Sequence, residues 1–117
     1  MERRWGNRLV LDETVRIMRD QEIMGLACLH ECSLSGGFLR TRWHIPNLTR
    51  VHIELCHEGP CPERMVEAFV VRPSADGAGV EWCEFAPAGI THLMEGRRSR
   101  LAMLSREIRQ PGRRAVK

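Results

Sequence analysis

Hydrophobic and polar residues alternate along most of this chain, and a period of two is typical of β-strands with one buried face. The pattern predicts a first strand that begins at Leu9–Leu11 and continues through Thr14–Met18. The strands predicted after it are Leu26–Cys32, Phe38–Arg42, Val51–Leu55, Glu67–Arg72 and Gly79–Phe85. Loops rich in glycine, proline and polar residues separate them, and Arg19–Gly25 is predicted as a polar turn. Six short strands at this spacing predict a closed antiparallel barrel or a sandwich.

The period changes to that of a helix from Ile90 onward. The apolar residues that fall on one helical face, with arginines mostly opposite, are Ile90, Met94, Leu101, Leu104 and Ile108. This stripe predicts a helix over residues 90–110 that caps the core of the strands. Gly96 weakens the helix locally, and Pro111–Gly112 ends it. Residues 111–117 are predicted to form a disordered basic tail.

The composition is that of one ordinary globular domain, with 117 residues of which 43% are hydrophobic and 28% charged. The longest apolar run, Ile23–Leu29, is too short to cross a bilayer. The first residues do not resemble a secretory or transit signal, so a cytoplasmic location is expected. The five cysteines are odd in number and irregularly spaced, which favours reduced thiols over a disulfide framework.

The net charge of +3 is unevenly distributed along the chain. Residues 1–89 contain 10 Arg and 13 acidic residues, which gives a net charge of −3. Residues 90–117 contain seven Arg, one Lys and two Glu, which gives a net charge of +6. A basic C-terminal segment therefore follows a mildly acidic body.

Two short patches carry the most specific chemistry. They consist of Arg3, Arg4 and Arg8 near the N-terminus, and of Glu31, Ser33, Gly36 and Gly37 after an apolar strand. Guanidinium groups bind phosphates and the acceptor edge of guanine through paired hydrogen bonds, and a carboxylate accepts from the guanine N–H groups. Ser33 lies two residues after Glu31, so on a strand it would share the face of that carboxylate. The two glycines allow a tight turn and a close approach by a ligand.

In this order and spacing, the patches resemble the split signature of the PilZ domain, RRxxxR followed by [D/N]xSxxG. The three arginines match the first part, and Ser33 and Gly36 match the second. Glu31 stands where the family has Asp or Asn. The resemblance implies an all-β fold, a six-stranded antiparallel barrel with a C-terminal α-helix. Within one domain it implies an arm over residues 1–8, a barrel over 9–89, a helix over 90–110 and a tail over 111–117.

The same resemblance implies a bacterial receptor for cyclic di-GMP that is not an enzyme and needs no metal or other cofactor. Arg4 and Arg8 would hold the phosphates and guanine edges, with Arg3 assisting. The residues that would contact a guanine from the outer face of the barrel are Glu31, Ser33, Gly36 and Gly37, and Cys32 would then point inward. The arm is expected to become ordered on the ligand, and a separate effector protein would read this change. Motility and biofilm outputs are both compatible with the family.

Glu31 leaves a second interpretation open. Its longer side chain either reaches a guanine edge after a rotation, crowds the site, or forms an ion pair with Arg4 or Arg8 that competes with the ligand. A degenerate PilZ-like adaptor would act through protein contacts alone, for example in type IV pilus assembly. A monomer or a weak dimer is expected in either case.

Other functions fit the sequence less well. Cys28 and Cys32 would lie about 13 Å apart on a strand, too far to share one tetrahedral metal ion, and Cys56-x4-Cys61 is a poor zinc spacing. The arginines of the C-terminal segment suit nucleic acid, anionic lipid or an acidic partner. A solvated helix face is the more usual role of such residues, and no nucleic-acid partner is expected because the three tryptophans are scattered and tyrosine is absent. The chain lacks an ordered nucleophile constellation and a dinucleotide fingerprint, which argues against an enzyme.

Overall fold

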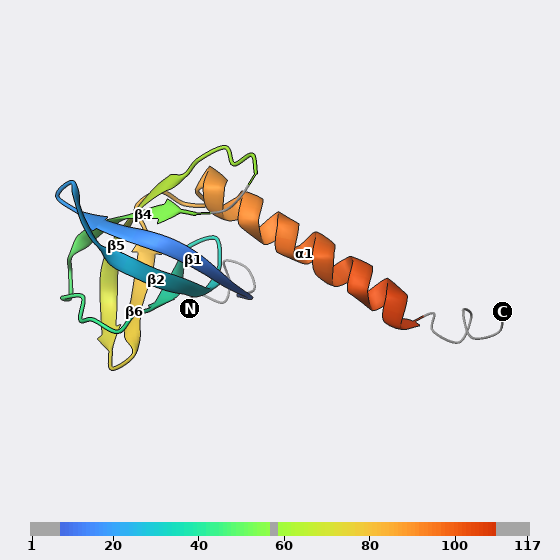
Figure 1. Ribbon diagram of the computed structural model, residues 1–117, viewed down its shortest axis with the longest axis horizontal. Coiled ribbons are helices and arrows are strands. Elements are labelled where there is room, and N and C mark those ends of the chain that lie inside the picture. Colours follow the sequence, from blue (N-terminus) through green and yellow to red (C-terminus); the bar gives the residue numbers. More distant parts are fainter. Residues whose placement is uncertain (1–7, 57–58, 110–117) are drawn as a thin grey trace.

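The computed structural model describes residues 8–56 and 59–109. Its elements are β1 (Leu9–Arg19), β2 (Glu22–Cys32), β3 (Gly36–Arg40), β4 (Arg50–Leu55), β5 (Met65–Ser74), β6 (Gly77–Trp82) and α1 (Ala88–Arg109). The strands form a closed antiparallel barrel in the order β1-β2-β3-β6-β5-β4, and the pairing of β1 with β4 closes it (Figure 1). The predicted six-stranded barrel with a C-terminal helix is therefore confirmed, and the sandwich is excluded.

The core of the barrel is built from alternate residues of the strands, as the pattern of the sequence predicts. The fully buried side chains that fill it include Val15, Ile17, Leu29, Leu39, Val51, Ile53, Val66 and Val70. Three residues of α1, Ile90, Leu93 and Met94, belong to the same buried cluster. Side chains of the strands and of the helix thus pack together inside the barrel.

The turn between β1 and β2 is much shorter than the predicted turn Arg19–Gly25. Only Asp20 and Gln21 separate the strands, and their φ angles of 52° and 69° correspond to a two-residue hairpin turn. Gly25 instead lies within β2, where a Cβ would be 3.1 Å from Nε1 of Trp43. This glycine makes room for the indole ring, so its presence did not mark a turn.

Irregularities in β1 and β2 decide which side chains face outward near the end of the hairpin. The β2–β3 register shifts between Leu29 and Glu31, and the β1–β2 register shifts between Val10 and Glu13. A bulge adds one residue to a strand and resets its alternation. Glu31 consequently faces the outside, and Cys32 is completely buried, as the sequence predicted for that thiol.

Strands β3, β5 and β6 also have boundaries that differ from the prediction. β3 is Gly36–Arg40, two residues earlier than predicted, because both glycines of the motif pair with β6. β5 and β6 extend toward each other until only Ala75 and Asp76 separate them. Proline, glycine and polar residues there had suggested a longer loop, but a two-residue turn accommodates them.

Helix α1 begins two residues before the predicted Ile90, and Oε1 of Glu63 accepts a hydrogen bond from its Gly89 N–H at 3.0 Å. The prediction that the whole apolar stripe caps the core is wrong. Leu101 and Leu104 are 40% and 53% exposed, and Figure 1 shows the helix running past the barrel into solvent. Among the described residues, no helix is long and apolar enough to cross a membrane. The predicted end of the helix at Pro111–Gly112 and the predicted tail lie outside the described residues.

Candidate functional site

The residues of the two sequence patches that the structure describes meet beside the β2–β3 turn. A cavity of about 80 Å³ there is lined by Arg8, Ser35, Gly36, Gly37, Val71, Arg72, Val80 and Glu81. Its walls come from the residue before β1, from the end of the β2–β3 turn and the start of β3, and from the strands β5 and β6. The barrel therefore brings Arg8, the two glycines and a further arginine to one point on its surface.

Arg8 is held at this site by the carboxylate that follows the β2 bulge. Its Nη1 lies 3.7 Å from Oε1 of Glu31, and both side chains are about one-third exposed. Val10 and Glu31 are cross-strand partners, so Arg8 leaves the barrel next to the end of β2. An ion pair this exposed is worth at most about 1 kcal/mol. A phosphate could therefore displace Glu31 from Arg8 at a low energetic cost.

The two glycines are fixed by backbone packing. A Cβ on Gly36 would overlap the carbonyl oxygen of Val80, and a Cβ on Gly37 would lie 2.7 Å from the carbonyl oxygen of Glu31. Both positions are buried between neighbouring strands. They are thus required for the β2–β3–β6 sheet to form, and they also leave the cavity wall without side chains.

Ser33 does not lie where the sequence placed it. β2 ends at Cys32, and Ser33 is only 1% exposed, so it does not share the outer strand face of Glu31. Its hydroxyl lies within the turn, accepting from Ser35 N–H at 3.3 Å and lying 3.4 Å from the Gly36 carbonyl oxygen. Its carbonyl accepts the Nε1–H of Trp82 at 2.9 Å. The strand ends one residue too early for the predicted placement, and Ser33 instead shapes the turn.

Two charged residues of the cavity, Arg72 and Glu81, were not identified from the sequence. Arg72 pairs with Gly79 of β6, where a Cβ would be 3.4 Å from Nη2 of the arginine. Since Gly79 has no side chain, Arg72 can lie across β6. Glu81 is opposite Gly36 in the β3–β6 register. Neither residue belongs to a local motif, and only the strand order of the barrel places them beside Arg8.

Arg98, near the middle of α1, adds positive charge at the same end of the barrel. Burial raises the pKa of the Cys32 thiol to about 12, against the smaller opposing influence of the Arg8 and Arg98 charges. Both guanidinium groups are therefore close enough to Cys32 to act on it through the field they create. Arg3 and Arg4, the other predicted ligand-binding residues, lie outside the described residues.

A hydrogen-bonded cluster lies farther along the outer face of β1, β2 and β3. Arg40 Nη2 donates to His30 Nε2 at 3.3 Å, and His30 Nδ1 donates to Asp12 Oδ1 at 2.6 Å. The hydrogen bond from His30 is the main reason why the pKa of Asp12 is lowered. Arg40 also lines a shallow groove of about 580 Å³ with Trp43. This groove contains neither sequence patch.

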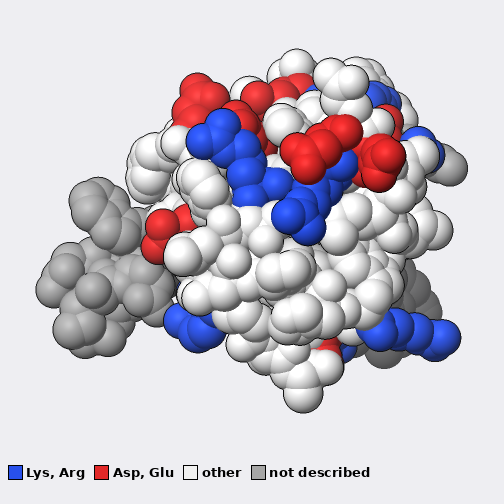
Figure 2. Space-filling view, turned by 90° about the vertical axis from the view of Figure 1, so that its left-hand side faces the viewer, with Lys and Arg blue, Asp and Glu red and all other residues white. Residues whose placement is uncertain are grey.

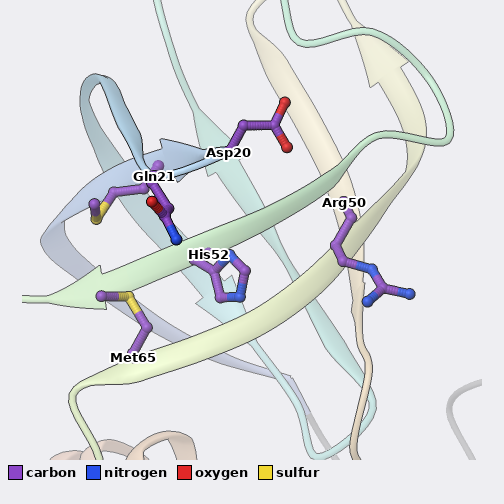
Figure 3. Close-up of a pocket in the computed structure, with 6 residues that line it drawn as sticks. Asp20, Gln21, Arg50, His52 and Met65 are labelled. Carbon is purple, nitrogen blue, oxygen red and sulfur yellow. The ribbon is translucent and has the colours of Figure 1, made fainter.

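A second hollow of about 350 Å³ lies beside the β1–β2 turn. It is lined by Met18, Asp20, Gln21, Arg50, His52 and Met65. Figure 3 shows His52 between Gln21 and Met65, while the carboxylate of Asp20 and the guanidinium of Arg50 point away from the ring. Arg50 is already engaged, because it donates to Glu67 at 2.9 Å and lies 5.0 Å from the centre of the Phe69 ring. This hollow is larger than the cavity that Arg8 lines, but its arginine is already paired and is less available to an anion.

Arginines elsewhere on the barrel are mostly neutralised by neighbouring carboxylates. Arg16 lies 3.4 Å from Glu54, and Arg50 lies 2.9 Å from Glu67. Figure 2 shows the same interleaving, with blue and red side chains side by side above a broad uncharged surface. The cavity beside the β2–β3 turn differs, since it brings two arginines together with bare backbone, although the carboxylates of Glu31 and Glu81 lie beside them.

No protein-family model matches the chain, and no curated protein matches it in sequence.

Proposed function

We propose that this protein is a cyclic di-GMP receptor of the PilZ type that signals to a separate effector protein. The observation that carries the proposal is the cavity in which Arg8 and Arg72 face the glycine-walled β2–β3 turn. Guanidinium forks and bare backbone suit a ligand that combines phosphates with planar guanine edges. The order of the sequence patches and the barrel with a C-terminal helix support the same assignment.

In the proposed complex the ligand enters by replacing an internal ion pair. A ligand phosphate takes the place of Glu31 on Arg8, and Arg72 binds from the opposite wall. The released carboxylate of Glu31, together with Glu81, is then available to accept from the N1–H and N2–H groups of a guanine. The cavity of about 80 Å³ receives only one edge of the ligand. The remainder lies outside it, where Arg3 and Arg4 of the arm would contribute.

A calorimetric titration with cyclic di-GMP tests this proposal. Losing a hydrogen bond to a charged group costs about 1.5–3 kcal/mol, so Arg8→Ala and Arg72→Ala should each weaken binding by roughly tenfold or more. Arg16→Ala is the matched control. Arg16 lies on β1 and is also paired with a carboxylate, that of Glu54, but it lies outside the cavity. Arg4→Ala/Arg8→Ala should abolish measurable binding.

The Arg8–Glu31 ion pair also supports a second candidate function, a PilZ-like adaptor that binds proteins without the nucleotide. In that case Glu31 permanently occupies the arginine that the ligand needs. Wild-type protein would give no heat with cyclic di-GMP, and Glu31→Asp would be tested next. Binding restored by the shorter carboxylate would identify Glu31 as the residue that closes the site. No binding by either protein would reject the receptor.

A further inference from the structure

The first half of β2 has an edge that no described strand of the barrel covers. β1 pairs with β2 from Glu22 to Cys32, whereas β3 pairs with it only from Cys28 to Cys32. After β3 the chain turns away, and Thr41 N–H donates to the carbonyl oxygen of Asp76 at 3.1 Å. Within the described ranges, no loop forms a backbone hydrogen bond with residues 22–27. An exposed strand edge of this kind is a template for pairing with another strand.

Two large apolar side chains stand on the outer face of this segment. Ile23 pairs with Met18 and Leu26 pairs with Arg16, and these two residues of β1 are two positions apart. Ile23 and Leu26 therefore lie on the same face, because a bulge at Met24 adds one residue to β2 between them. They are 60% and 62% exposed. The open edge is thus also apolar.

The two ends of the open edge carry opposite charges. At its start, Glu22 and the Asp20 of the β1–β2 turn are both exposed. At its other end lies the groove of about 580 Å³, which Leu26 lines together with Arg40 and Arg42. The groove has one acid, Asp76, which already accepts from the Ser74 hydroxyl at 3.0 Å. The edge is therefore acidic where β2 begins and basic where β3 ends.

We propose that a second copy of this chain covers the edge, with the two β2 strands antiparallel about a two-fold axis. In this register Ile23 lies opposite Leu26 of the partner subunit, and the reciprocal contact is identical by symmetry. Apolar pairs directly opposite each other on neighbouring strands stabilise a sheet. The pairing extends over residues 22–27 of each strand, a length of about 20 Å at about 3.4 Å per residue.

Charge complementarity favours this occupant and this direction. Glu22 lies opposite Ala27 of the partner subunit, next to Cys28 of the partner subunit, whose own β3 neighbour is an arginine. The acidic tip of each β1–β2 hairpin thus meets the arginine-lined end of the other groove, twice in one dimer. A parallel pair would instead place the two acidic tips side by side, which like charges disfavour.

The register also has a natural limit, because β3 occupies the edge from Cys28 onward and the incoming strand stops there. Gly37, part of the candidate ligand cavity, pairs with Cys32 at the far end of β2. The proposed dimer and the proposed nucleotide site therefore use opposite ends of the same strand.

Sedimentation velocity of the nucleotide-free protein tests the dimer, in reducing buffer so that the exposed Cys56 and Cys83 do not cross-link. We expect a concentration-dependent dimer between about 1 and 300 µM, the range that brackets micromolar affinity. Ile23→Lys/Leu26→Lys should raise the dissociation constant by roughly tenfold or more, because lysines on an edge strand oppose pairing. Leu48→Lys is the matched control, since Leu48 is 75% exposed but lies in the β3–β4 loop.

A charge reversal tests the direction of the strands. Glu22→Lys should raise the dissociation constant by roughly fivefold or more, because an attraction becomes a repulsion at both ends of the antiparallel pair. Glu95→Lys makes the same change of net charge at an exposed residue of α1 and should leave the dimer unchanged. A dimer that Glu22→Lys does not weaken would reject the antiparallel arrangement.

Amide hydrogen exchange of the wild type tests the edge without any substitution. Exchange in residues 22–27 should slow as the concentration rises through the same range, while exchange in α1 should not change. Circular dichroism of every variant checks that the barrel remains folded. A monomer throughout the range, a dimer that the double lysine variant leaves intact, or a dimer without protection of residues 22–27 would overturn the proposal.

Discussion

At the scale of single residues, close packing explains several positions that resemble ligand contacts in the sequence. Gly36 and Gly37 are needed because neighbouring backbone leaves no room for a Cβ. Ser33 is turned into the β2–β3 turn, and Cys32 is in the core. Among the described residues of the signature, Arg8 and Glu31 remain exposed enough to exchange partners with a ligand.

Replacing Gly36 with alanine should therefore destabilise the fold itself. The new methyl group would overlap the Val80 carbonyl, and overpacking of this kind costs about 1–3 kcal/mol. Gly96→Ala is the opposite case, because the nearest atom to its Cβ is Nη1 of Arg100 at 3.8 Å and alanine favours the helix by about 1 kcal/mol. Urea denaturation measures both, and an unchanged midpoint for Gly36→Ala would contradict the packing argument.

The buried thiol of Cys32 should make the stability of the protein sensitive to alkaline pH. Its pKa is about 12 in the folded state against an ordinary value of 9.0. The unfolded chain releases this proton first, so the contribution to stability is complete below pH 9.0 and is lost as pH rises toward about 12. Urea midpoints measured through this range should fall less steeply for Cys32→Ala than for wild type. Cys56→Ala, at an exposed cysteine, should keep the wild-type slope.

At the scale of the elements, the β2–β3 turn is fastened to β6, and this link positions the candidate site. Trp82 donates from its backbone N–H to Ser35 at 3.0 Å and from its indole Nε1–H to Ser33 at 2.9 Å. Both acceptors are carbonyl oxygens of the turn. A single residue of β6 thus holds the turn that leads into Gly36 and Gly37 of the cavity wall.

Trp82→Phe should loosen this turn while keeping an aromatic ring in the core. The carbonyl of Ser33 would lose its buried donor, and an unsatisfied buried acceptor costs about 1–3 kcal/mol. We expect the variant to have a lower urea midpoint than the wild type. Its amide hydrogens should exchange faster than those of the wild type in residues 33–37, while the increase in β4 should be smaller. Unchanged exchange in the turn would show that Trp82 does not position it.

At the scale of the whole molecule, the distribution of charge matters more than the net value. Each of Arg16 and Arg50 on the barrel has its own carboxylate partner. Arg8 and Arg72 instead share one cavity with Glu81, beside Glu31, and the charge of Arg98 acts on the same end. The cationic end of the barrel therefore lies beside the beginning of the projecting helix.

Binding of cyclic di-GMP should consequently weaken as salt is added. The screening length falls from about 10 Å at 0.1 M to about 3 Å at 1 M, so the attraction of several arginines for a doubly anionic ligand is progressively lost. Titrations over this range should show a rising dissociation constant for wild type and a shallower rise for Arg8→Ala. The Arg16→Ala control should follow the wild type, and a salt-independent affinity would argue against electrostatic recognition.

The sequence by itself determined the elements of this protein, because each depends on a local period. Alternation of apolar residues identified all six strands, and the change of period at Ile90 identified the helix to within two residues. The motif also located Arg8, Gly36 and Gly37 of the candidate site, because each half of the motif is a short stretch of sequence. Turn lengths were less predictable, because Gly25 is required by Trp43, a residue distant in the sequence.

Only the tertiary structure decided what surrounds those residues. The choice of a barrel over a sandwich depends on β1 pairing with β4, and the same closure brings Arg72 and Glu81 to the cavity from strands far along the chain. The burial of Ser33 depends on where β2 ends, and the exposure of Leu101 depends on the direction in which α1 leaves the barrel. Local periodicity shows which side of an element is apolar. Long-range packing determines whether that apolar side is buried in the core of the protein or left exposed.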